Sequence, residues 1–354
     1  MRDYTTMMVY KCPLSGMSQK DRFVQFCSTG IVCFKNKIKM KKRVLTVALV
    51  SYIFGLPLQA QAPKKELKGE ITVSGAFALY PLAVKWAEEF KKIHPQVKID
   101  ISAGGAGKGI TDALSNVVDL GMVSREIHPE EFKKGAWAVA VAKDAVVPTI
   151  NAKNPKIKEL LAKGLTQSAA NKIFISGENK TWGNVLGTSS AIPIHVYTRS
   201  DACGAADTWA QYFGKKQEDL KGTAVFGDPG LASAIQKDAL GIGYNNISYA
   251  YDFKTKRPNA GILVLPIDVN NNGRIDPTER FYGTSSQLIT AIAKGLYPSP
   301  PARDLYLVSN GKPTKPVVKA FLKFILSEGQ KYNVPNGFIR LSNNKLNAGI
   351  AKLK

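Results

Sequence analysis

The chain has 354 residues, 44% of them hydrophobic and 21% charged, with a formal net charge of +22. This composition is typical of a globular protein, and the length is sufficient for two lobes with cores of their own. No stretch after residue 62 is long and apolar enough to span a bilayer, and no nucleic-acid motif or dense basic run follows it, so nucleic acid is not an expected partner.

Residues 40–62 have the pattern of a secretory signal peptide. A basic stretch at 40–43 precedes an apolar run at 44–58, and a small-x-small sequence ends at Ala62. A membrane anchor is the alternative, but the run is short and ends in a cleavage-like sequence. We therefore expect cleavage near Ala62 and a periplasmic or secreted mature protein.

Residues 1–39 precede this complete signal sequence and contain three of the four cysteines. We interpret them as an upstream extension from a start codon assigned too early, with initiation at Met40. The mature chain then has one cysteine, Cys203, so a disulfide within one chain is excluded. Residues 1–62 contain ten Lys or Arg and two Asp or Glu, so their removal lowers the net charge from +22 to +14. A basic mature chain favours anionic partners.

Strands, glycine loops and helices alternate in the first part of the mature chain. Alternating or short apolar runs predict strands, and apolar residues at helical spacing, such as Leu82, Trp86 and Phe90, predict helices. This order predicts an α/β lobe with a largely parallel sheet. The predicted strands are 71–75, 97–101 and 120–123, and the predicted helices are 81–93 and 110–118.

Two later runs, 138–151 and 241–250, are rich in β-forming residues and lack helical spacing. About a hundred residues between them have helix and strand signals of their own, including a strand at 192–198. An inserted lobe between two extended crossings is typical of a hinged, two-lobed protein, and a helix near 317–327 follows in the C-terminal part. We place the crossings near 146–150 and 243–248, one lobe at 63–146 with 249–354, and the other at 147–248.

Three glycine-containing loops, 74–78, 104–109 and 199–205, lie at predicted strand-to-helix junctions. Unpaired N–H groups at a helix N-terminus, with the helix dipole behind them, form an anion site. One such loop alone is commonly a structural turn. Three of them in a basic chain favour a site for an anion.

Residues 268–279 fit a twelve-residue calcium loop of the EF-hand type. Calcium takes about six to eight oxygen ligands, and Gly273 allows the turn that directs them to one centre. An apolar run stands where an EF-hand has a helix, and only one loop is present, so we predict a structural Ca²⁺ within another fold, in the lobe formed by 63–146 and 249–354. An Asn- and Gly-rich surface turn is the alternative. The candidate ligands are Asp268, Asn270, Asn272, the Arg274 carbonyl, Asp276 through a water, and Glu279.

With these loops, the chain resembles the periplasmic phosphate-binding proteins of ABC transporters over about residues 70–342. The resemblance implies an α/β, two-lobed type II periplasmic binding protein fold with two hinge crossings. It implies a protein that captures a small oxyanion, with phosphate the first candidate, and delivers it to the membrane permease of an ABC transporter without catalysis. The segments that carry it are 71–86, 118–125, 147–155, 240–244, 305–308, 321–330 and 337–339.

The resemblance also implies the anion-binding residues, but four hydroxyl positions of the family differ here. Phe77, Ala106, Cys203 and Ala205 stand where the family usually has Ser or Thr. Hydrogen bonds to charged groups contribute about 1.5–3 kcal/mol each, and micromolar binding totals only about 8 kcal/mol. Other donors must therefore compensate, or the ligand differs. The candidates are Phe77, Ala78, Ala106, Gly107, Ser124, Arg125, Arg199, Cys203, Gly204 and Ala205.

Among these candidates, the remaining donors are the backbone N–H groups of Phe77, Ala78, Ala106 and Gly107, the Ser124 hydroxyl and the Arg199 guanidinium. Arg125 stands where some phosphate binders have an aspartate, and it either contacts a fully ionised anion or turns outward. We expect Asp201 to orient Arg199 or to cap the following helix.

Cys203 and the missing hydroxyls leave alternatives open. The thiol is either reactive, with a lowered pKa at a helix N-terminus beside Arg199, or a small buried residue, which we favour. An extracellular sensory or structural protein on the same fold, with altered or lost anion binding, is the second functional hypothesis. A secreted hydrolase is the weakest, because no nucleophile and base are paired in the sequence.

Overall fold

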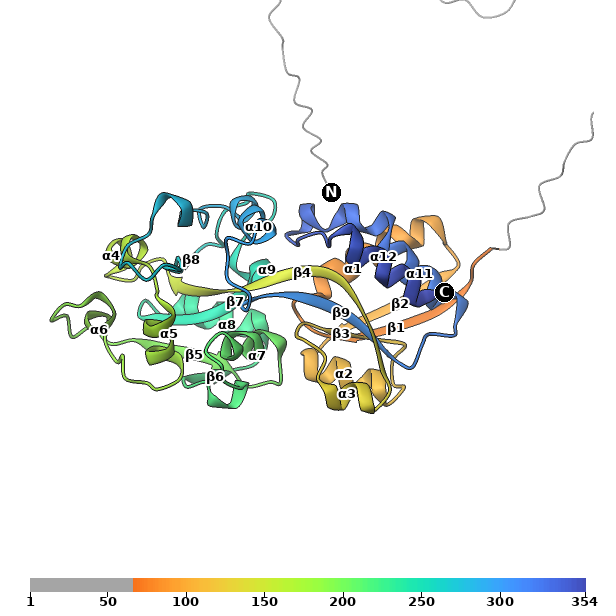
Figure 1. The fold of residues 1–354 in the computed structure, drawn as a ribbon, viewed down its shortest axis with the longest axis horizontal. Coiled ribbons are helices and arrows are strands. Elements are labelled where there is room, and N and C mark those ends of the chain that lie inside the picture. The colour runs from red at the N-terminus through yellow and green to blue at the C-terminus, as the bar shows by residue number, and fades with distance from the viewer. Residues whose placement is uncertain (1–65) are drawn as a thin grey trace, which may run out of the picture. The chain divides into compact units, whose positions relative to one another are not determined.

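The computed structural model describes residues 66–354, so the predicted signal peptide and the upstream extension lie outside the described residues. The described part is a mixed α/β protein (Figure 1) in which nine strands form one continuous sheet with the order β2-β1-β3-β9-β4-β7-β5-β6, and β8 pairs with β4. No helix within residues 66–354 has the length and apolar character needed to cross a membrane.

The strands are β1 (Gly69–Gly75), β2 (Val97–Ala103), β3 (Leu120–Val123), β4 (Ala136–Asn151), β5 (His195–Arg199), β6 (Thr223–Val225), β7 (Gly241–Asn246), β8 (Ile262–Val264) and β9 (Ala302–Asn310). The helices are α1 (Tyr80–Ile93), α2 (Ala106–Leu114), α3 (Pro129–Lys133), α4 (Ile157–Lys163), α5 (Gln167–Phe174), α6 (Trp182–Leu186), α7 (Gly204–Gln211), α8 (Gly227–Lys237), α9 (Ile247–Ala250), α10 (Ser285–Ala293), α11 (Pro316–Leu326) and α12 (Asn343–Leu353).

The first half of the sheet has the predicted βαβ organisation. β1 pairs in parallel with both β2 and β3, and β9 then adds antiparallel to β3. Helix α1 covers this sheet with a fully apolar face, in which Trp86 and Phe90 are 0% and 1% exposed. The apolar spacing in the sequence therefore identified both the helix and its buried face.

Helix α2 begins earlier than predicted. The sequence places it at 110–118, whereas it spans Ala106–Leu114 and takes in most of the glycine loop. Its glycines let it lie against the sheet backbone, since a Cβ on Gly109 would come within 2.4 Å of the Met122 carbonyl oxygen. The helix ends at Leu114 with Ser115 as its C-cap, and Asn116 follows with a left-handed φ of 57°.

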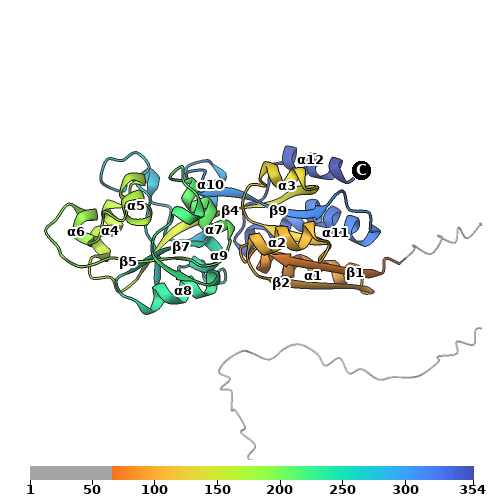
Figure 2. The same cartoon turned by 90° about the horizontal axis from the view of Figure 1, so that it is seen from below.

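One strand, β4, joins the two halves of the sheet. Its residues 136–145 pair with β9, its residues 146–150 pair with β7, and its last residues pair with β8. Figures 1 and 2 show β4 and β9 running side by side from the β1–β3 group toward the β5–β7 group. The predicted crossing near 146–150 coincides with the change of partner from β9 to β7.

The predicted second crossing near 243–248 differs from the structure. After β7 the chain turns into the short helix α9, and β8 then pairs with residues 149–151, on the same side of the crossing as β7. The chain returns only at β9, where Ala302 pairs with Ala145. β8 and the loop at 268–279 therefore contact residues assigned by the sequence to the other lobe, because long-range strand pairing cannot be read from local pattern.

Buried hydrophobic residues form one cluster in each half and a third beside the crossing. The first joins α1, the β1–β3 group, β9 and α11, and the second joins α5, α7, α8 and β7. The third packs α9 and α10 against Ala145 and Val147 of β4. Each half thus has a core of its own, and the crossing strand contributes to all three clusters.

Substitution of Gly109 by alanine tests the close packing of α2 on the sheet. The added methyl would overlap the Met122 carbonyl, so we expect Gly109→Ala to lower the free energy of unfolding by about 1–3 kcal/mol. Urea unfolding followed by tryptophan fluorescence measures this loss. In the control, Gly230→Ala in α8, the new methyl meets only the rotatable Val225 side chain, at 3.0 Å. Equal losses in both variants would contradict the packing argument.

Candidate anion site

The three glycine loops predicted from the sequence lie where predicted, between a strand and the start of a helix. β1 leads to α1, β2 leads to α2, and β5 leads to α7. The first N–H groups of a helix have no acceptor within it, so each loop presents backbone donors near a helix N-terminus.

The second and third loops touch through their backbones. The Gly107 N–H donates to the Ala202 carbonyl at 3.1 Å. Gly204 stands directly against Ser124, since a Cβ at residue 204 would lie 2.1 Å from the Ser124 carbonyl oxygen. A side chain at this position would separate the two segments, so glycine is required for their contact.

Arg199, at the end of β5, is the central charged residue of the site. Its buried guanidinium donates to both carboxylate oxygens of Asp201, at 2.8 and 2.5 Å, and to Asp228 Oδ2 at 2.6 Å. The Phe77 ring of the first loop lies over the guanidinium, 5.6 Å from its centre. The orienting role predicted for Asp201 is therefore confirmed.

The two carboxylate partners of Arg199 stabilise its positive charge. Burial lowers the pKa of the guanidinium, but the negative charges of Asp228 and Asp201 outweigh it and raise the pKa. Three of its five N–H groups are used in these ion pairs, which leaves two for another acceptor.

Asp228 was not identified from the sequence. It lies 2% exposed in the first turn of α8, and its second oxygen accepts a hydrogen bond from Asn246 Nδ2 at 2.5 Å. The sequence signal that could have found it is the turn glycine Gly227, with a φ of 72°, which precedes it at another strand-to-helix junction.

Arg303 of β9 is a second buried arginine that the sequence did not identify. Its guanidinium donates to the Gly204 carbonyl, to the Asn246 side-chain oxygen and to Thr208 Oγ1, the last at 2.9 Å. Asp144 lies opposite it in the β4–β9 register, 3.8 Å from Nη2. Arg303 thus ties the start of α7 to the crossing strands.

Several predicted donors take no part in the hydrogen bonds formed within residues 66–354. The Ser124 hydroxyl, 3% exposed, is one of them. Gly107 differs, because its N–H is already bound to Ala202. Among the candidate residues, the backbone N–H groups of Phe77, Ala78, Ala106, Gly204 and Ala205 bind no acceptor within residues 66–354.

Arg125 is engaged in an ion pair with α3. Its two terminal nitrogens donate to the two carboxylate oxygens of Glu131 in α3, at 2.9 and 2.7 Å. Burial raises the pKa of Glu131, but hydrogen bonds from Arg125 and the His128 N–H outweigh it and lower the pKa below its ordinary value. Arg125 thus has a carboxylate partner of its own, and its contact with an anion stays a prediction.

Cys203 is the N-cap of α7, and its Sγ accepts a hydrogen bond from the Ala206 N–H at 3.3 Å. The side chain is 5% exposed, and burial raises the pKa of the thiol to about 12. A lowered pKa was the reactive alternative, and it is wrong because burial outweighs the charge of Arg199. The thiol stands here as a packed, neutral capping group.

The buried carboxyl of Asp144 predicts a pH dependence of stability. Burial raises its pKa from 3.8 to about 7. Between these values the folded protein holds a proton that the unfolded chain does not, so the contribution of Asp144 is favourable at low pH and is lost as pH rises toward 7. Asn at this position resembles the protonated form and does not titrate. As pH rises from about 5 to about 8, the free energy of unfolding of wild type should therefore fall by on the order of 1–3 kcal/mol more than that of Asp144→Asn.

Urea unfolding of both proteins at the two pH values measures this difference. Removal of the partner of Arg303 lowers the stability of the variant at every pH, so only the change with pH is compared. Parallel pH profiles for wild type and variant would contradict a raised pKa for Asp144.

Comparison with known proteins identifies a matching family and several relatives. Residues 60–329 match the family model of a PBP superfamily domain. The chain is 30% identical over 301 residues to the phosphate-binding protein PstS of Pseudomonas aeruginosa, covering 78% of this chain and 84% of that protein. It is 27% identical over 310 residues to the protein SphX of Synechococcus elongatus, covering 83% and 82%.

Solved structures of similar fold include a protein from Clostridium perfringens assigned as a phosphate ABC transporter substrate-binding protein, with bound phosphate. It has a TM-score of 0.63 and 24% identity, and the match covers 77% of this chain and all of that one. An ABC-type phosphate transport receptor from Vibrio cholerae has a TM-score of 0.56 and 20% identity, with 76% and 99% covered. These structures confirm the predicted two-lobed α/β fold.

Proposed function

Because the chain belongs to the PBP superfamily, and within it to the phosphate-binding proteins, we propose that it captures phosphate and delivers it to the permease of an ABC transporter. The predicted signal peptide at 40–62 would place the mature protein in the periplasm or outside the cell, where such delivery begins. The meeting of three helix N-termini beside Arg199 is the observation that carries this proposal.

Backbone donors replace the missing hydroxyls in this proposal. The unused N–H groups of Phe77 and Ala78 belong to the first loop, that of Ala106 to the second, and those of Gly204 and Ala205 to the third. With the Ser124 hydroxyl and the two remaining N–H groups of Arg199, they supply more donors than the four absent side chains. Hydrogen bonds from such groups to an anion contribute about 1.5–3 kcal/mol each.

The two carboxylates on Arg199 favour an anion that can still donate a proton. Asp201 and Asp228 already balance the guanidinium charge, so a fully ionised anion beside them meets repulsion. Phosphate near neutral pH carries a proton that a carboxylate can accept, whereas sulfate carries none. We therefore infer a preference for phosphate over sulfate.

We also infer that binding is the whole function and that no chemical step follows it. The Cys203 thiol has a raised pKa, and His195 hydrogen-bonds Asp238 at 2.7 Å on an exposed edge of β5. Neither is arranged as a nucleophile with its base. The sensory or structural alternative receives no support from the matched PstS proteins, which are named as phosphate-binding proteins.

Substitution of Ser124 by alanine tests the phosphate site. Isothermal titration of residues 63–354, freed of bound ligand by unfolding and refolding, should give phosphate binding in the micromolar range or tighter and much weaker sulfate binding. Removal of one hydroxyl donor to a charged ligand should weaken phosphate binding about 10- to 100-fold. The exposed Ser168→Ala in α5 is the control and should bind as wild type does. Absence of phosphate binding in wild type, or equal affinity for sulfate, would overturn the proposal.

The calcium site predicted at 268–279 remains part of the proposal. Asp268 and Glu279, its first and last residues, are 1% and 6% exposed, and neither has a Lys or Arg partner within residues 66–354. Backbone N–H groups are their hydrogen-bond donors, among them Gly273 N to Asp268 at 2.8 Å and Val269 N to Glu279 at 2.9 Å. Buried carboxylates are costly without a cation, so Ca²⁺ would offset their charge.

The other candidate ligands are amide and carbonyl oxygens. No three acidic, His or Cys side chains among residues 66–354 gather as a metal cluster, so Asn270, Asn272 and the Arg274 carbonyl would have to complete the coordination. Asp276 accepts hydrogen bonds from both asparagines, at 2.9 and 2.7 Å, which place the three side chains on one side of the loop. This set of hard oxygen donors suits calcium.

Chelation tests the calcium site. The loop is bound to the last turn of α4 by hydrogen bonds such as Ile275 N to the Ala162 carbonyl, at 2.9 Å, so loss of Ca²⁺ should loosen this region. We expect EDTA to lower the melting temperature of wild type by several degrees, roughly 1–2 kcal/mol of stability. The double variant Asp268→Ala, Glu279→Ala should melt at the same temperature with and without EDTA. A wild type that responds to neither calcium nor EDTA would show that the loop is only a turn.

A further inference from the structure

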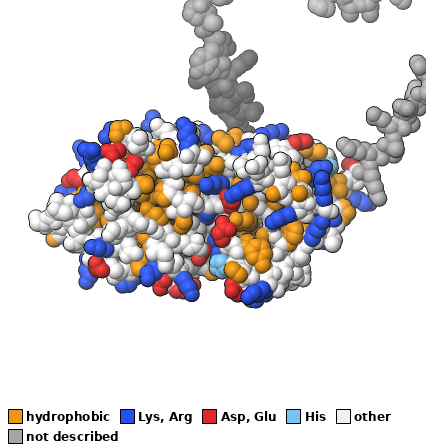
Figure 3. Space-filling model, viewed as in Figure 1, with side chains coloured by type: hydrophobic (Ala, Val, Ile, Leu, Met, Phe, Trp, Pro, Cys, Tyr) orange, Lys and Arg blue, Asp and Glu red, His pale blue; other side chains and the backbone are white. Residues whose placement is uncertain are grey.

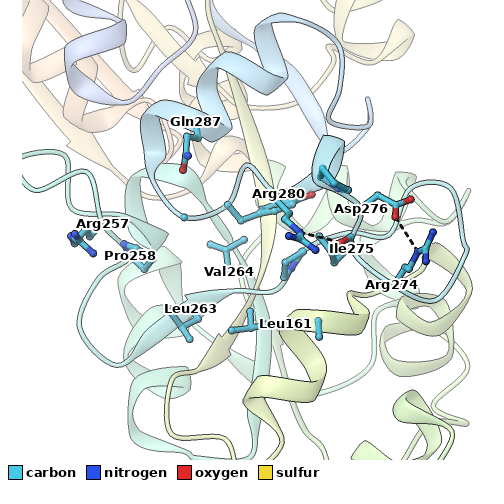
Figure 4. Close-up of a pocket in the computed structure, with 15 residues that line it drawn as sticks. Leu161, Arg257, Pro258, Leu263, Val264, Arg274, Ile275, Asp276, Arg280 and Gln287 are labelled. Atoms are coloured by element: carbon cyan, nitrogen blue, oxygen red, sulfur yellow. Dashed lines mark hydrogen bonds and ion pairs between the residues drawn. The ribbon is translucent and has the colours of Figure 1, made fainter.

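A cavity of about 990 Å³ lies between α4, β8 and the segment that leads from the calcium-type loop to α10 (Figure 4). None of the ten residues named for the anion site lines it. Its volume is at the upper end of the range of about 300–1,000 Å³ that holds small organic ligands.

The floor of the cavity is apolar. Leu161 of α4 and Leu263 and Val264 of β8 lie together on one side, and Ile275 and Tyr282 are among the other apolar residues that line the cavity. Figure 3 shows hydrophobic side chains gathered on the surface over β8 and α10. An apolar surface of this kind favours the non-polar body of a ligand, because burial stabilises it by about 25 cal/mol per Å².

The rim of the cavity is positively charged. Arg257, Arg274 and Arg280 line it, and Asp276 is the only acidic residue that does so. Arg274 pairs with Asp276 at 3.1 Å. Arg257 and Arg280 form no ion pair within the described chain, and Arg280 donates only a 3.3 Å bond to the Ile275 carbonyl.

Figure 4 shows how the arginine side chains lie relative to the apolar side of the cavity. Arg280 projects over the middle of the cavity, with Leu161, Leu263 and Val264 below it, and Arg257 lies at one end beside Pro258. An anionic group held by either arginine can therefore be joined to an apolar body that rests on the leucines. Inorganic phosphate offers no such body and leaves most of the cavity unfilled.

We propose that this cavity binds an amphiphilic organic anion, whose carboxylate, sulfonate or phosphate pairs with Arg280 or Arg257 while its apolar body covers Leu161, Leu263 and Val264. This is a second binding site, independent of the phosphate loops. Because residues 274–277 of the calcium-type loop form one wall, the position of that loop shapes the cavity.

A pair of fluorescent probes with the same kind of aromatic body tests the proposal. 8-Anilinonaphthalene-1-sulfonate carries a negative charge, and N-phenyl-1-naphthylamine does not. Titration of the ligand-free protein should give one site for the sulfonate, bound more tightly than the neutral probe. Arg257→Gln with Arg280→Gln should weaken the sulfonate about five- to tenfold and the neutral probe less than about twofold.

Two further variants separate the site from other surfaces. Leu161→Gln should weaken both probes, because it removes apolar floor without touching the charge. Arg340→Gln, an exposed arginine elsewhere in the chain, should change neither. Far-UV circular dichroism and melting establish that each variant is folded, and unchanged phosphate affinity keeps this result separate from the phosphate site.

The source of the ligand is resolved by a parallel measurement with phosphatidylglycerol vesicles. Flotation with the vesicles that depends on Arg257 and Arg280 assigns a lipid headgroup, and probe binding without flotation assigns a dissolved anion. Probe binding that is equal for the two dyes, or insensitive to both the arginine pair and Leu161, would overturn the proposal.

Discussion

The fold depends on one strand that must satisfy its backbone hydrogen bonds with three partners. β4 pairs with β9 over its first ten residues and then with β7 and β8. A buried strand cannot leave N–H and C=O groups unpaired, so the halves of the sheet are fixed to each other wherever β4 passes between them. The change of partner between Ala145 and Val146 is the point at which β4 passes from one half of the sheet to the other.

Charged residues gather at this same point. Arg303 and Asp144 face each other one register step before the change of partner, and Arg303 reaches from there to the start of α7. Arg199 reaches the same region from the end of β5 and is held by Asp201 and Asp228. Asp228 and Asn246 connect the two arginines, so the candidate site and the crossing share one network of buried hydrogen bonds and charges.

Local pattern in the sequence predicted the elements better than their long-range pairing. α1, its buried Trp86 and Phe90, and the three glycine loops followed from apolar spacing and from glycines after strands. The return of the chain at β9 did not, because it depends on which distant strands pair. The 241–250 run was likewise only partly a strand, since α9 replaces its end.

The same limit explains which site residues were found. Arg199 and Ser124 stand in loops that resemble known motifs, whereas Asp228 and Arg303 act through contacts with residues far away in the sequence. The absence of four hydroxyls predicted either compensating donors or a different ligand, and the sequence could not decide, because it does not show which backbone N–H groups are unbound. Only the folded chain distinguishes Gly107, whose N–H is bound, from Ala106, whose N–H is not.

The position of β9 also sets the order in which the molecule can be assembled. β9 lies between β3 and β4 in the sheet, although about 150 residues separate it from β4 in the chain. Until residue 310 is available, the first half of the sheet has an unfilled gap between two of its strands. In the proposed export, with the N-terminus first, this half would stay incomplete until nearly all of the chain had crossed, and the topology would therefore delay folding until then.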